Sequence, residues 1–399
     1  MKIGIMGGTF DPIHNGHLYI AKRAKKEFSL DKVLFIPTGV SYMKTGVSKA
    51  EHRYEMVRLA IKDYPDFEIS DLEVFRGGNT YTFETLEELK KIYPGAKLYF
   101  IIGTDTLFML EKWRNVESIF ASATILVADR EGDGRDKQSK KADELKKKYD
   151  ARIKFMKAEP YNISATLLRA SFKIPSPAYR IKPDCPELVA KYAEEHELYS
   201  QFPMNDDEIL ELLKLDLKPK RLVHSLGVRD TAVELAEIHH LDVDKARRAA
   251  LLHDCAKYLS LNDKIKLCQE YDYPVSSLEL DNPELLHAKA GAALATEKYG
   301  VTDPEILDAI RYHTTGKPNM SPLTLVIFIS DYIEPGRSHS PRLNDFRVLA
   351  KENLAKCAAC ILEETCIYLE QRPNNKTKAI DPTTKQSYEF YKIYLEAGE

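Results

Sequence analysis

Two groups of residues in this 399-residue chain have the types and spacing that phosphate chemistry requires. The first lies near the N-terminus, where Gly7 and Gly8 end an apolar run and His14 and His17 stand three residues apart. Main-chain amides and ring N–H groups in such a setting suit anion binding. The second group combines imidazoles with carboxylates, a donor set that suits iron, manganese or zinc rather than calcium. Its members are His224, His253, Asp254, His287, His313 and Asp331.

A strand, a glycine-rich loop and a helix must position the first group. Apolar residues from Ile3 to Met6 predict a strand, and the stretch from Leu18 to Ala24 predicts a helix. Gly7, Gly8 and Gly16 would let the main chain approach a ligand closely. An ordinary glycine turn with two surface histidines is the alternative, and the Gly-Gly turn followed by a His-x-Gly-His helix entry weighs against it.

Strands and helices alternate through the first half of the chain. Apolar runs predict further strands at 33–36, 67–70, 98–102 and 123–128, and helical spacing predicts helices at 51–61 and 82–92. Strands that are apolar on both faces and separated by helices indicate a parallel sheet covered on both sides. Ligands of such sheets bind beyond the carboxyl ends of the strands. We therefore expect one crevice beside Gly7, Pro37, Gly103 and Asp129.

The stretch Gly-Gly-Thr-Phe-Asp-Pro-Ile-His-Asn-Gly-His, residues 7–17, resembles the signature of bacterial nicotinate mononucleotide adenylyltransferases, within the HIGH-motif nucleotidyltransferases. The resemblance extends to about residue 200. It implies a Rossmann-like α/β domain over residues 1–203 that transfers AMP from ATP to nicotinate mononucleotide, with Mg²⁺ accompanying ATP. The attacking phosphate is already anionic, so the protein needs to align the reactants and stabilise charge on the leaving pyrophosphate.

The same resemblance implies roles for individual residues. It implies catalytic roles for His14, His17, Lys44 and Arg169. Substrate contacts fall to Gly7, Gly8, Thr9, Phe10, Tyr81, Thr82, Gly103, Asp105, Trp113, Ser164 and Thr166. In this scheme Tyr81 and Thr82 frame the nicotinate end and Trp113 stacks on its ring. Ser164 and Thr166 can also cap a helix from which Arg169 holds ATP phosphates.

Three of these positions carry an open alternative or a departure from the family pattern. Trp113 could equally be a core aromatic residue, and Asp105 could be a helix N-cap. Where the family often reads Pro-Pro-His-Lys, this chain reads Ser-Tyr-Met-Lys at residues 41–44. Lys44 is retained, while the role of its loop in substrate binding is left open.

Strand signals end near residue 200, and helical patterns follow one another to about Glu370. Residues 200–205 read as a linker, with Asn205 or Asp206 capping the next helix. This change predicts a separate all-α domain over residues 204–399. The apolar run 323–329 reads as a buried helix with Asp331 at its end, where an isolated buried carboxylate would need a cation or a metal.

In their order along the chain, the six metal-site candidates resemble the HD-domain metal phosphohydrolases, over roughly residues 205–370. Their flanking motifs are similar to those of a bacterial branch that hydrolyses diadenosine tetraphosphate symmetrically to two ADP with a two-iron centre. These motifs are Arg221-Leu-Val-His224, His253-Asp-Cys-Ala-Lys257, His313-Thr-Thr-Gly316 and Asp331-Tyr-Ile-Glu-Pro335.

That likeness implies two metal ions, iron or manganese, that activate water for attack on phosphorus. One ion would be held by His224, His253, Asp254 and Asp331, and the other by His287, His313 and a bridging Asp254. Lys257 and Arg337 would bind the polyphosphate, and the alternative is that both are solvated surface charges.

Composition narrows the class of protein. A net charge of −3 provides no basic field for a nucleic acid. No apolar run approaches the roughly 20 residues that cross a bilayer, and a strand at the very start leaves no room for a signal peptide. Six scattered cysteines suit a cytoplasmic protein. Cys357 and Cys360 read as packing, since no second pair completes a zinc site.

The lysine-rich segment from Glu131 to Tyr149 predicts a loop followed by a solvated helix over 142–149, a surface face rather than a site for an acidic partner. Together these features predict a two-enzyme chain whose ligands are ATP, nicotinate mononucleotide and diadenosine tetraphosphate, with a homodimer as one possible assembly. The alternatives are a nucleotidyltransferase for another acceptor, such as a pantetheine phosphate, and a helical domain that senses nucleotides without hydrolysis or acts on another nucleotide.

Overall fold

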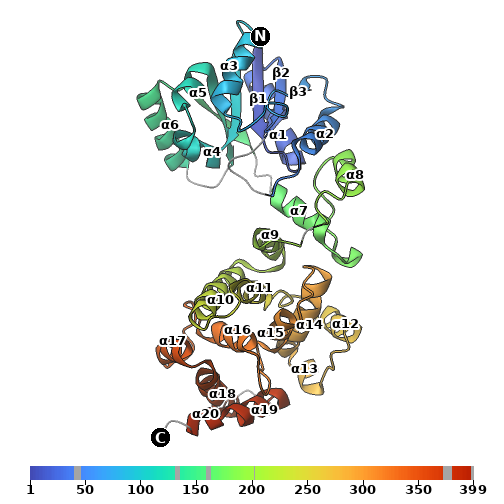
Figure 1. Ribbon diagram of the computed structural model, residues 1–399, viewed down its shortest axis with the longest axis vertical. Coiled ribbons are helices and arrows are strands. Elements are labelled where there is room, and N and C mark those ends of the chain that lie inside the picture. Colours follow the sequence, from blue (N-terminus) through green and yellow to red (C-terminus); the bar gives the residue numbers. More distant parts are fainter. Residues whose placement is uncertain (40–45, 131–134, 159–162, 202, 372–379, 397–399) are drawn as a thin grey trace. The chain divides into compact units, whose positions relative to one another are not determined.

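A computed structural model of the chain describes residues 1–39, 46–130, 135–158, 163–201, 203–371 and 380–396 (Figure 1). Contacts divide the chain into two units, Met1–Phe172 with Ile181–Phe202 and Lys173–Arg180 with Pro203–Glu399. The first unit is a parallel α/β unit, and the described residues of the second form only helices between turns and loops. This confirms the predicted fold class.

The first unit is built on a six-stranded parallel sheet with the order β3-β2-β1-β4-β5-β6. The chain winds outward from β1 to β3 and then returns to place β4 against the other side of β1. The carboxyl ends of β1 and β4 therefore flank the topological switch point, where open parallel sheets bind ligands. The strands are β1 (Lys2–Gly8), β2 (Lys32–Pro37), β3 (Phe67–Ile69), β4 (Lys97–Gly103), β5 (Ala123–Arg130) and β6 (Ile153–Ala158).

Helices cover both faces of the sheet, because successive strand residues alternate between two cores (Figure 1). Ile5 packs into the core that includes α3, α4, α5 and α6, while Met6 packs into the core that includes α1, α2, α7 and α8. The helices are α1 (Asn15–Phe28), α2 (Ala50–Ile61), α3 (Thr82–Ile92), α4 (Thr104–Met109), α5 (Val116–Ser122), α6 (Arg135–Tyr149), α7 (Ala165–Lys173) and α8 (Glu187–Glu195), with 3-10 turns η1 (Leu110–Lys112) and η2 (Pro177–Tyr179).

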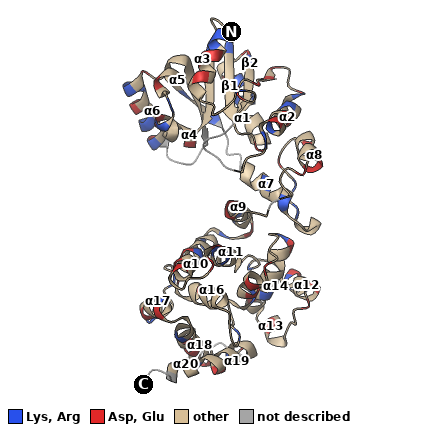
Figure 2. Cartoon of the chain, viewed as in Figure 1, with Lys and Arg blue, Asp and Glu red and all other residues tan. Residues whose placement is uncertain are grey.

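Two elements differ from the sequence prediction. Strand β6 was not predicted, because Lys154 and Lys157 interrupt its apolar residues, and its position at the sheet edge explains that pattern. Helix α6 begins at Arg135, so the predicted loop before residue 142 is wrong over much of its length. Figure 2 shows charged residues along α6. Its Lys141 and Lys148 both pair with Glu111, which supports a surface role for this face.

The second unit packs its helices around α16, whose residues from Leu323 to Ser330 are all buried. This confirms the buried helix predicted for the apolar run. Asn205 caps α9 by accepting a bond of 3.0 Å from the amide of Glu208. The helices are α9 (Asp206–Asp216), α10 (Pro219–Ile238), α11 (Val243–Leu252), α12 (Leu261–Glu270), α13 (Ser277–Asp281), α14 (Pro283–Glu297), α15 (Pro304–Tyr312), α16 (Pro322–Ile333), α17 (Leu343–Glu352), α18 (Leu354–Gln371), α19 (Pro382–Tyr391) and α20 (Ile393–Glu396).

Cys357 and Cys360 lie buried on α18 as free thiols, so the packing interpretation of this pair is confirmed. Among the described residues, no helix combines the length and the apolar character that a membrane span requires.

Candidate active sites

A cavity of about 480 Å³ opens at the switch point of the sheet, within the first unit. Its floor is formed by the carboxyl ends of β1 and β4, and its walls come from α1, α3 and the segment that contains Trp113. Of the residues predicted to act in the first unit, those that line this cavity are Gly7, Gly8, Thr9, His17, Tyr81, Thr82, Gly103 and Trp113.

His14 and His17 lie at the start of α1, with ring centroids 3.7 Å apart. His14 is the N-cap residue, and its amide donates to Nδ1 of His17 at 3.2 Å. A neutral His17 that accepts at Nδ1 carries its proton on Nε2, which makes that atom a donor for a ligand. His17 lines the cavity, whereas His14 as a whole residue is 9% exposed and is not among the residues that line it.

Phe10 and Gly16 have structural roles that differ from the predicted ligand contacts. The Phe10 side chain is buried in the core, 5.1 Å from the His17 ring between centroids, so it supports His17 and does not line the cavity. A Cβ on Gly16 would lie 3.0 Å from Nδ1 of His14. This glycine therefore makes room for the histidine ring, where close approach to a ligand was expected.

Arg169 on α7 reaches the loop that precedes α1. Its Nη1 donates to the carbonyl of Asp11 at 2.8 Å, and its Nη2 donates to the hydroxyl of Thr166 at 3.2 Å. Ser164 caps α7 by accepting from the amide of Leu167 at 3.0 Å. Thr166 thus supports Arg169, while the capping contact belongs to Ser164. Lys44, the fourth predicted catalytic residue, lies outside the described residues.

The far end of the cavity is built by Tyr81, Thr82 and Trp113. Tyr81 is the N-cap residue of α3, and its ring lies 4.8 Å from the guanidinium carbon of Arg114. The Trp113 ring packs edge-on against Phe100, and its buried Nε1 has no hydrogen-bond partner among the described residues. Trp113 is therefore packed against the core at the edge of the cavity, and stacking on a nicotinate ring stays a prediction.

Gly103, and not Asp105, is the N-cap residue of α4, which makes the N-cap alternative for Asp105 wrong. The Asp105 side chain is exposed and is not among the residues that line the cavity.

Two buried charged residues of this site were missed by the sequence analysis. Glu73 lines the cavity, is 7% exposed and accepts from the Thr85 hydroxyl at 2.7 Å. Burial raises the pKa of Glu73, against hydrogen bonds from Thr85 and Thr80 that lower it. No periodic signal marks this loop residue.

The second is Arg53 on α2, which is 2% exposed. It donates to the carbonyls of Thr9 at 2.7 Å and Gly39 at 2.8 Å, and so ties together the loops after β1 and β2. Its helical spacing to the buried Val57 and Ala60 was the signal that could have found it.

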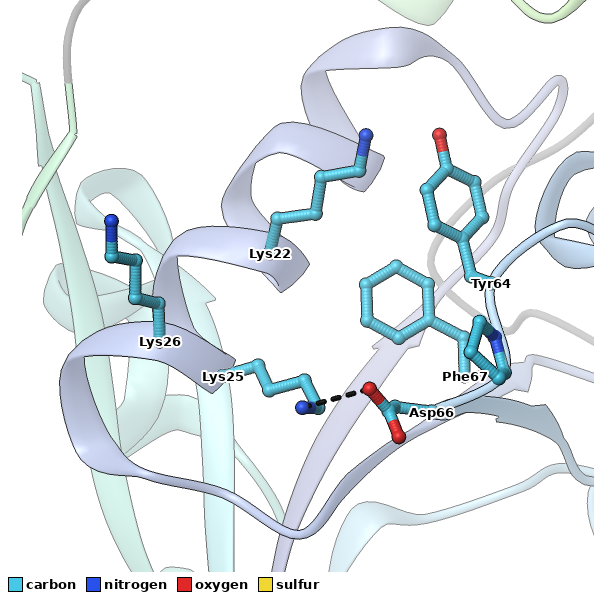
Figure 3. A pocket seen from close by; sticks show the side chains of 7 residues that line it. Lys22, Lys25, Lys26, Tyr64, Asp66 and Phe67 are labelled. Atoms are coloured by element: carbon cyan, nitrogen blue, oxygen red, sulfur yellow. Dashed lines mark ion pairs between the residues drawn. The ribbon is translucent and has the colours of Figure 1, made fainter.

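A second hollow of about 300 Å³ lies between α1 and the segment that leads into β3 (Figure 3). Lys25 pairs there with Asp66 at 2.8 Å, and the ammonium of Lys22 lies 4.4 Å from the centre of the Tyr64 ring. Because the end of α1 and the start of β3 both lie at the amino edge of the sheet, this hollow is separate from the cavity at the carboxyl edge.

In the second unit, the six predicted metal-site residues converge from α10, α11, α14, α15 and α16. One ligand atom from each residue lies within 4.8 Å of the others in three groups: His224, His253 and Asp254; His253, His313 and Asp331; and Asp254, His287 and His313. Asp254, His253 and His313 each belong to two of these groups. Oδ1 of Asp254 lies 2.9 Å from Nε2 of His287, and its Oδ2 lies 3.2 Å from Nε2 of His253.

The protonation pattern of the imidazoles suits metal ions. Nδ1 of His253 faces the carbonyl of Ala250 at 2.6 Å, and Nδ1 of His313 faces the carbonyl of Ile310 at 2.7 Å. Each neutral ring then turns an unprotonated Nε2 toward the cluster. Nε2 of His313 lies 3.1 Å from Nε2 of His287, so the two rings either share a proton in a hydrogen bond or both direct a lone pair at a common cation. The donor set therefore fits a metal centre.

Electrostatics within the cluster act differently on its members. Burial acts to lower the pKa of His253, but the charge of Asp254 and a hydrogen bond to it raise that pKa above its usual value. Burial, followed by the neighbouring His253 and His287, lowers the pKa of His313 to about 3. Burial acts to raise the pKa of Asp254, but the charges and hydrogen bonds of His253 and His287 hold it well below its usual range. Neutral imidazoles and ionised carboxylates are the forms that bind metals.

Cations surround the cluster. Nζ of Lys257 lies 3.1 Å from Glu284 and 3.9 Å from Asp254, and Arg337 contacts both the carboxylate and the carbonyl of Asp331. These contacts place both side chains at the cluster and argue against solvated surface charges. Arg221, quoted in the sequence only as part of a motif, donates to Oδ2 of Asp254 at 2.8 Å.

Glu334 is a further residue of this cluster that the sequence analysis did not single out. Its Oε1 lies 3.0 Å from Nδ1 of His224, on the side of the ring that faces away from Asp331. Its spacing of three residues from Asp331 at the end of a helix was the available signal.

Comparison with protein families matches both units. Residues 5–171 match the cytidylyltransferase-like family, and residues 221–336 match the HD domain family. Among individual proteins, the probable nicotinate-nucleotide adenylyltransferase/Ap4A hydrolase of Mycoplasma pneumoniae is 30% identical over 356 residues, which cover 88% of this chain and 94% of that protein.

Shorter matches cover one unit each. The probable nicotinate-nucleotide adenylyltransferase of Lachnoclostridium phytofermentans is 40% identical over 200 residues, 50% of this chain and 98% of that protein. A crystal structure of a predicted HD superfamily hydrolase involved in NAD metabolism from Clostridium acetobutylicum is 38% identical, with a TM-score of 0.45, and covers 48% of this chain and 98% of that one.

Proposed function

The chain belongs to the nicotinate-nucleotide adenylyltransferase/Ap4A hydrolase family, and on that premise we propose that it is a bifunctional enzyme of adenine nucleotides. Its α/β unit transfers AMP from ATP to nicotinate mononucleotide and releases pyrophosphate. Its helical unit hydrolyses diadenosine tetraphosphate symmetrically to two ADP. A cytoplasmic location belongs to this proposal, since the six cysteines are free thiols.

In adenylyl transfer, a phosphate oxygen of nicotinate mononucleotide forms a bond to the α-phosphorus of ATP while the bond to the β-phosphate oxygen breaks. No protein nucleophile is required. The observation that carries this proposal is the placement of His17 beside Gly7 and Gly8 at the switch-point cavity. Nε2 of His17 and the loop amides donate to phosphate oxygens, and Arg169 adds positive charge. Mg²⁺ bound to ATP would neutralise charge on the leaving phosphates.

The acceptor end of the cavity suits an aromatic carboxylate. The amides at the start of α3, beside Tyr81 and Thr82, suit the carboxylate of nicotinate. The Trp113 ring lines the same space and offers a face for the pyridine ring. A cavity of about 480 Å³ is within the range of small-ligand sites.

In diadenosine tetraphosphate hydrolysis, two metal ions, iron or manganese, would polarise phosphate oxygens and lower the pKa of water. The observation that carries this part is the facing pair of Nε2 atoms of His287 and His313 beside Asp254. The chain's own cations at the cluster, Lys257 and Arg337, would hold phosphate oxygens of the substrate. Asp254 would serve as a ligand together with His224 and His253, or together with His287 and His313.

The first activity is tested with purified full-length protein, ATP, Mg²⁺ and nicotinate mononucleotide, followed by chromatography for the dinucleotide. Parallel reactions with nicotinamide mononucleotide and with a pantetheine phosphate test the acceptor. The proposal expects the nicotinate compound to give the highest kcat/KM. Preference for the pantetheine phosphate would assign the unit to another nucleotidyltransferase.

The second activity is tested after chelation and dialysis, with Mg²⁺, Mn²⁺ or Fe²⁺ added back to separate samples. Symmetric cleavage of diadenosine tetraphosphate gives ADP alone, while asymmetric cleavage gives AMP and ATP. We expect Mg²⁺ alone to restore adenylyl transfer, and Mn²⁺ or Fe²⁺ to be needed for hydrolysis. Nucleotide binding without any ADP, under all three metals, would instead identify the helical unit as a sensor.

A further inference from the structure

Glu334 is a buried carboxylate that contacts one histidine of the candidate metal-binding cluster, His224. It follows the last residue of α16, is 5% exposed, and its Oε1 lies 3.0 Å from Nδ1 of His224 on α10. Nε2 of the same ring lies 2.9 Å from Oδ1 of Asp331. One edge of the His224 ring therefore faces the metal-ligand candidates and the other faces Glu334.

This arrangement sets His224 apart from the other histidines of the cluster. Nδ1 faces the main-chain carbonyl of the residue three positions earlier in three of the other histidines, His253, His287 and His313. His224 instead has a carboxylate at Nδ1. A carboxylate partner fixes the proton on Nδ1 and makes Nε2 a stronger ligand than a carbonyl partner does.

The surroundings of Glu334 are shaped for its carboxylate. The amide of Gly336 donates to Oε2, and a Cβ on Gly336 would lie 3.0 Å from both carboxylate oxygens. A Cβ on Gly227, within α10, would lie 2.6 Å from Oε2. Glycine inside a helix lowers helix stability relative to alanine. A glycine at position 227 therefore makes α10 less stable than an alanine would. The space left by its missing side chain is the space next to the Glu334 carboxylate.

The main chain at Glu334 is also held in place. Nε of Arg347 donates to the carbonyl of Ile333 at 2.9 Å, and its Nη2 donates to the carbonyl of Glu334 at 3.1 Å. The main chain at Glu334 is thus fixed, and its carboxylate passes between Gly227 and Gly336 to reach Nδ1 of His224.

We propose that Glu334 is a positioning residue of the metal centre. It holds the His224 ring with Nδ1 toward Glu334 and Nε2 toward Asp331, the orientation in which His224 would serve as a metal ligand together with His253, Asp254 and Asp331. It is not itself a ligand, because it contacts the ring nitrogen on the side away from the cluster. This inference rests on the proposed metal-dependent function of the helical unit.

The test measures Mn²⁺ binding to the full-length chain, by calorimetry and by counting bound ions, in the variants Glu334→Gln, Glu334→Ala and Gly227→Ala. Loss of an outer partner of a metal-bound histidine lowers affinity by roughly 10–100-fold. We expect Glu334→Ala to weaken one ion by that factor. Glu334→Gln, which keeps an acceptor for Nδ1, should lose less. Gly227→Ala should weaken the same ion without touching any ligand.

The matched control is Glu364→Gln, which removes a partly buried carboxylate that accepts from the Tyr332 hydroxyl at 2.9 Å on the neighbouring α18. It should bind Mn²⁺ as the wild type does. Equal melting temperatures of the metal-free proteins exclude a general loss of folding. Wild-type affinity in both Glu334→Ala and Gly227→Ala, while His224→Ala loses an ion, would overturn the positioning role alone. A wild-type chain that binds no ion would overturn the metal centre and the proposed hydrolase together.

Discussion

Nη1 of Arg169 donates to the main-chain carbonyl of Asp11 at 2.8 Å, a contact between residues 158 positions apart in the chain. Asp11 itself is held by the Tyr199 hydroxyl at 3.0 Å and by the amide of Ser48 at 3.2 Å. The guanidinium is therefore attached to the same loop that leads into His14 and His17. This contact joins the early and late parts of the first unit at the site proposed for ATP phosphates.

Arg169→Lys should lower adenylyl transfer even though the charge is kept, because one ammonium cannot reproduce the two bonds to Asp11 and Thr166. We expect turnover to fall about tenfold in Arg169→Lys and about 100-fold or more in Arg169→Ala. Initial rates with saturating ATP measure this. Arg23→Lys, which also removes an arginine bond to a carbonyl, is the control and should keep wild-type rates.

His17→Ala should reduce turnover far more than stability. Loss of a donor to a developing charge costs about 100–1,000-fold in rate. Loss of the bond from the His14 amide to Nδ1 costs about 1 kcal/mol, as for other capping contacts. Trp113 is the chain's only tryptophan and lies in the first unit, so its fluorescence reports unfolding of that unit.

The control for His17→Ala is His52→Ala, which removes a histidine that contacts Tyr192 on the same unit. A His17→Ala enzyme that kept its full turnover would remove this residue from the mechanism.

Asp254→Asn should abolish hydrolysis and leave adenylyl transfer intact. This carboxylate belongs to two of the three groups of candidate ligands. Loss of an outer partner of a metal ligand costs roughly 10–100-fold, and loss of Asp254 as a ligand should cost at least as much. Both activities are measured on one preparation, so the unaffected reaction shows that the chain is folded. Asp263→Asn, at the exposed start of α12, is the matched control. A parallel loss of both activities would contradict separate sites.

Glu73 should make the stability of the first unit depend on pH. Its pKa is raised above 4.5 by burial, so the native state binds this proton more tightly than the unfolded chain does. The contribution of Glu73 to stability therefore falls as pH rises from below 4.5 through the native pKa. Glu73→Gln removes this titration, and its stability relative to the wild type should increase between pH 4 and pH 7.

Denaturation followed by Trp113 fluorescence measures the pH effect. Glu87→Gln is the control, because Glu87 also accepts from a hydroxyl, that of Ser118 at 2.7 Å, but lies exposed. A difference between Glu73→Gln and the wild type that did not change with pH would contradict the raised pKa.

Much of the architecture was predictable because local signals and tertiary structure agree. Apolar runs marked β1, β2, β4 and β5, since strands buried on both faces must be apolar throughout. The motif that ends in His17 could be recognised because its residues follow one another within a short stretch of the chain. The histidines from His224 to His313 could be recognised from their order along the chain and from the short motifs that flank them. Strand β6 was missed, because a strand at the edge of the sheet is partly exposed to solvent and can carry charged residues among its apolar ones.

The contacts that the supporting residues make were decided only by the tertiary structure. Nothing in the neighbourhood of Glu334 in sequence indicates His224, which lies 110 positions away. Likewise, Arg53 and Glu73 act through loops brought together by the sheet. The periodicity of apolar residues indicates which face of a helix or strand is buried. A short motif indicates the chemistry of residues that are close in sequence. Which buried carboxylate meets which ring nitrogen depends on how distant helices pack, and that geometry exists only in the folded chain.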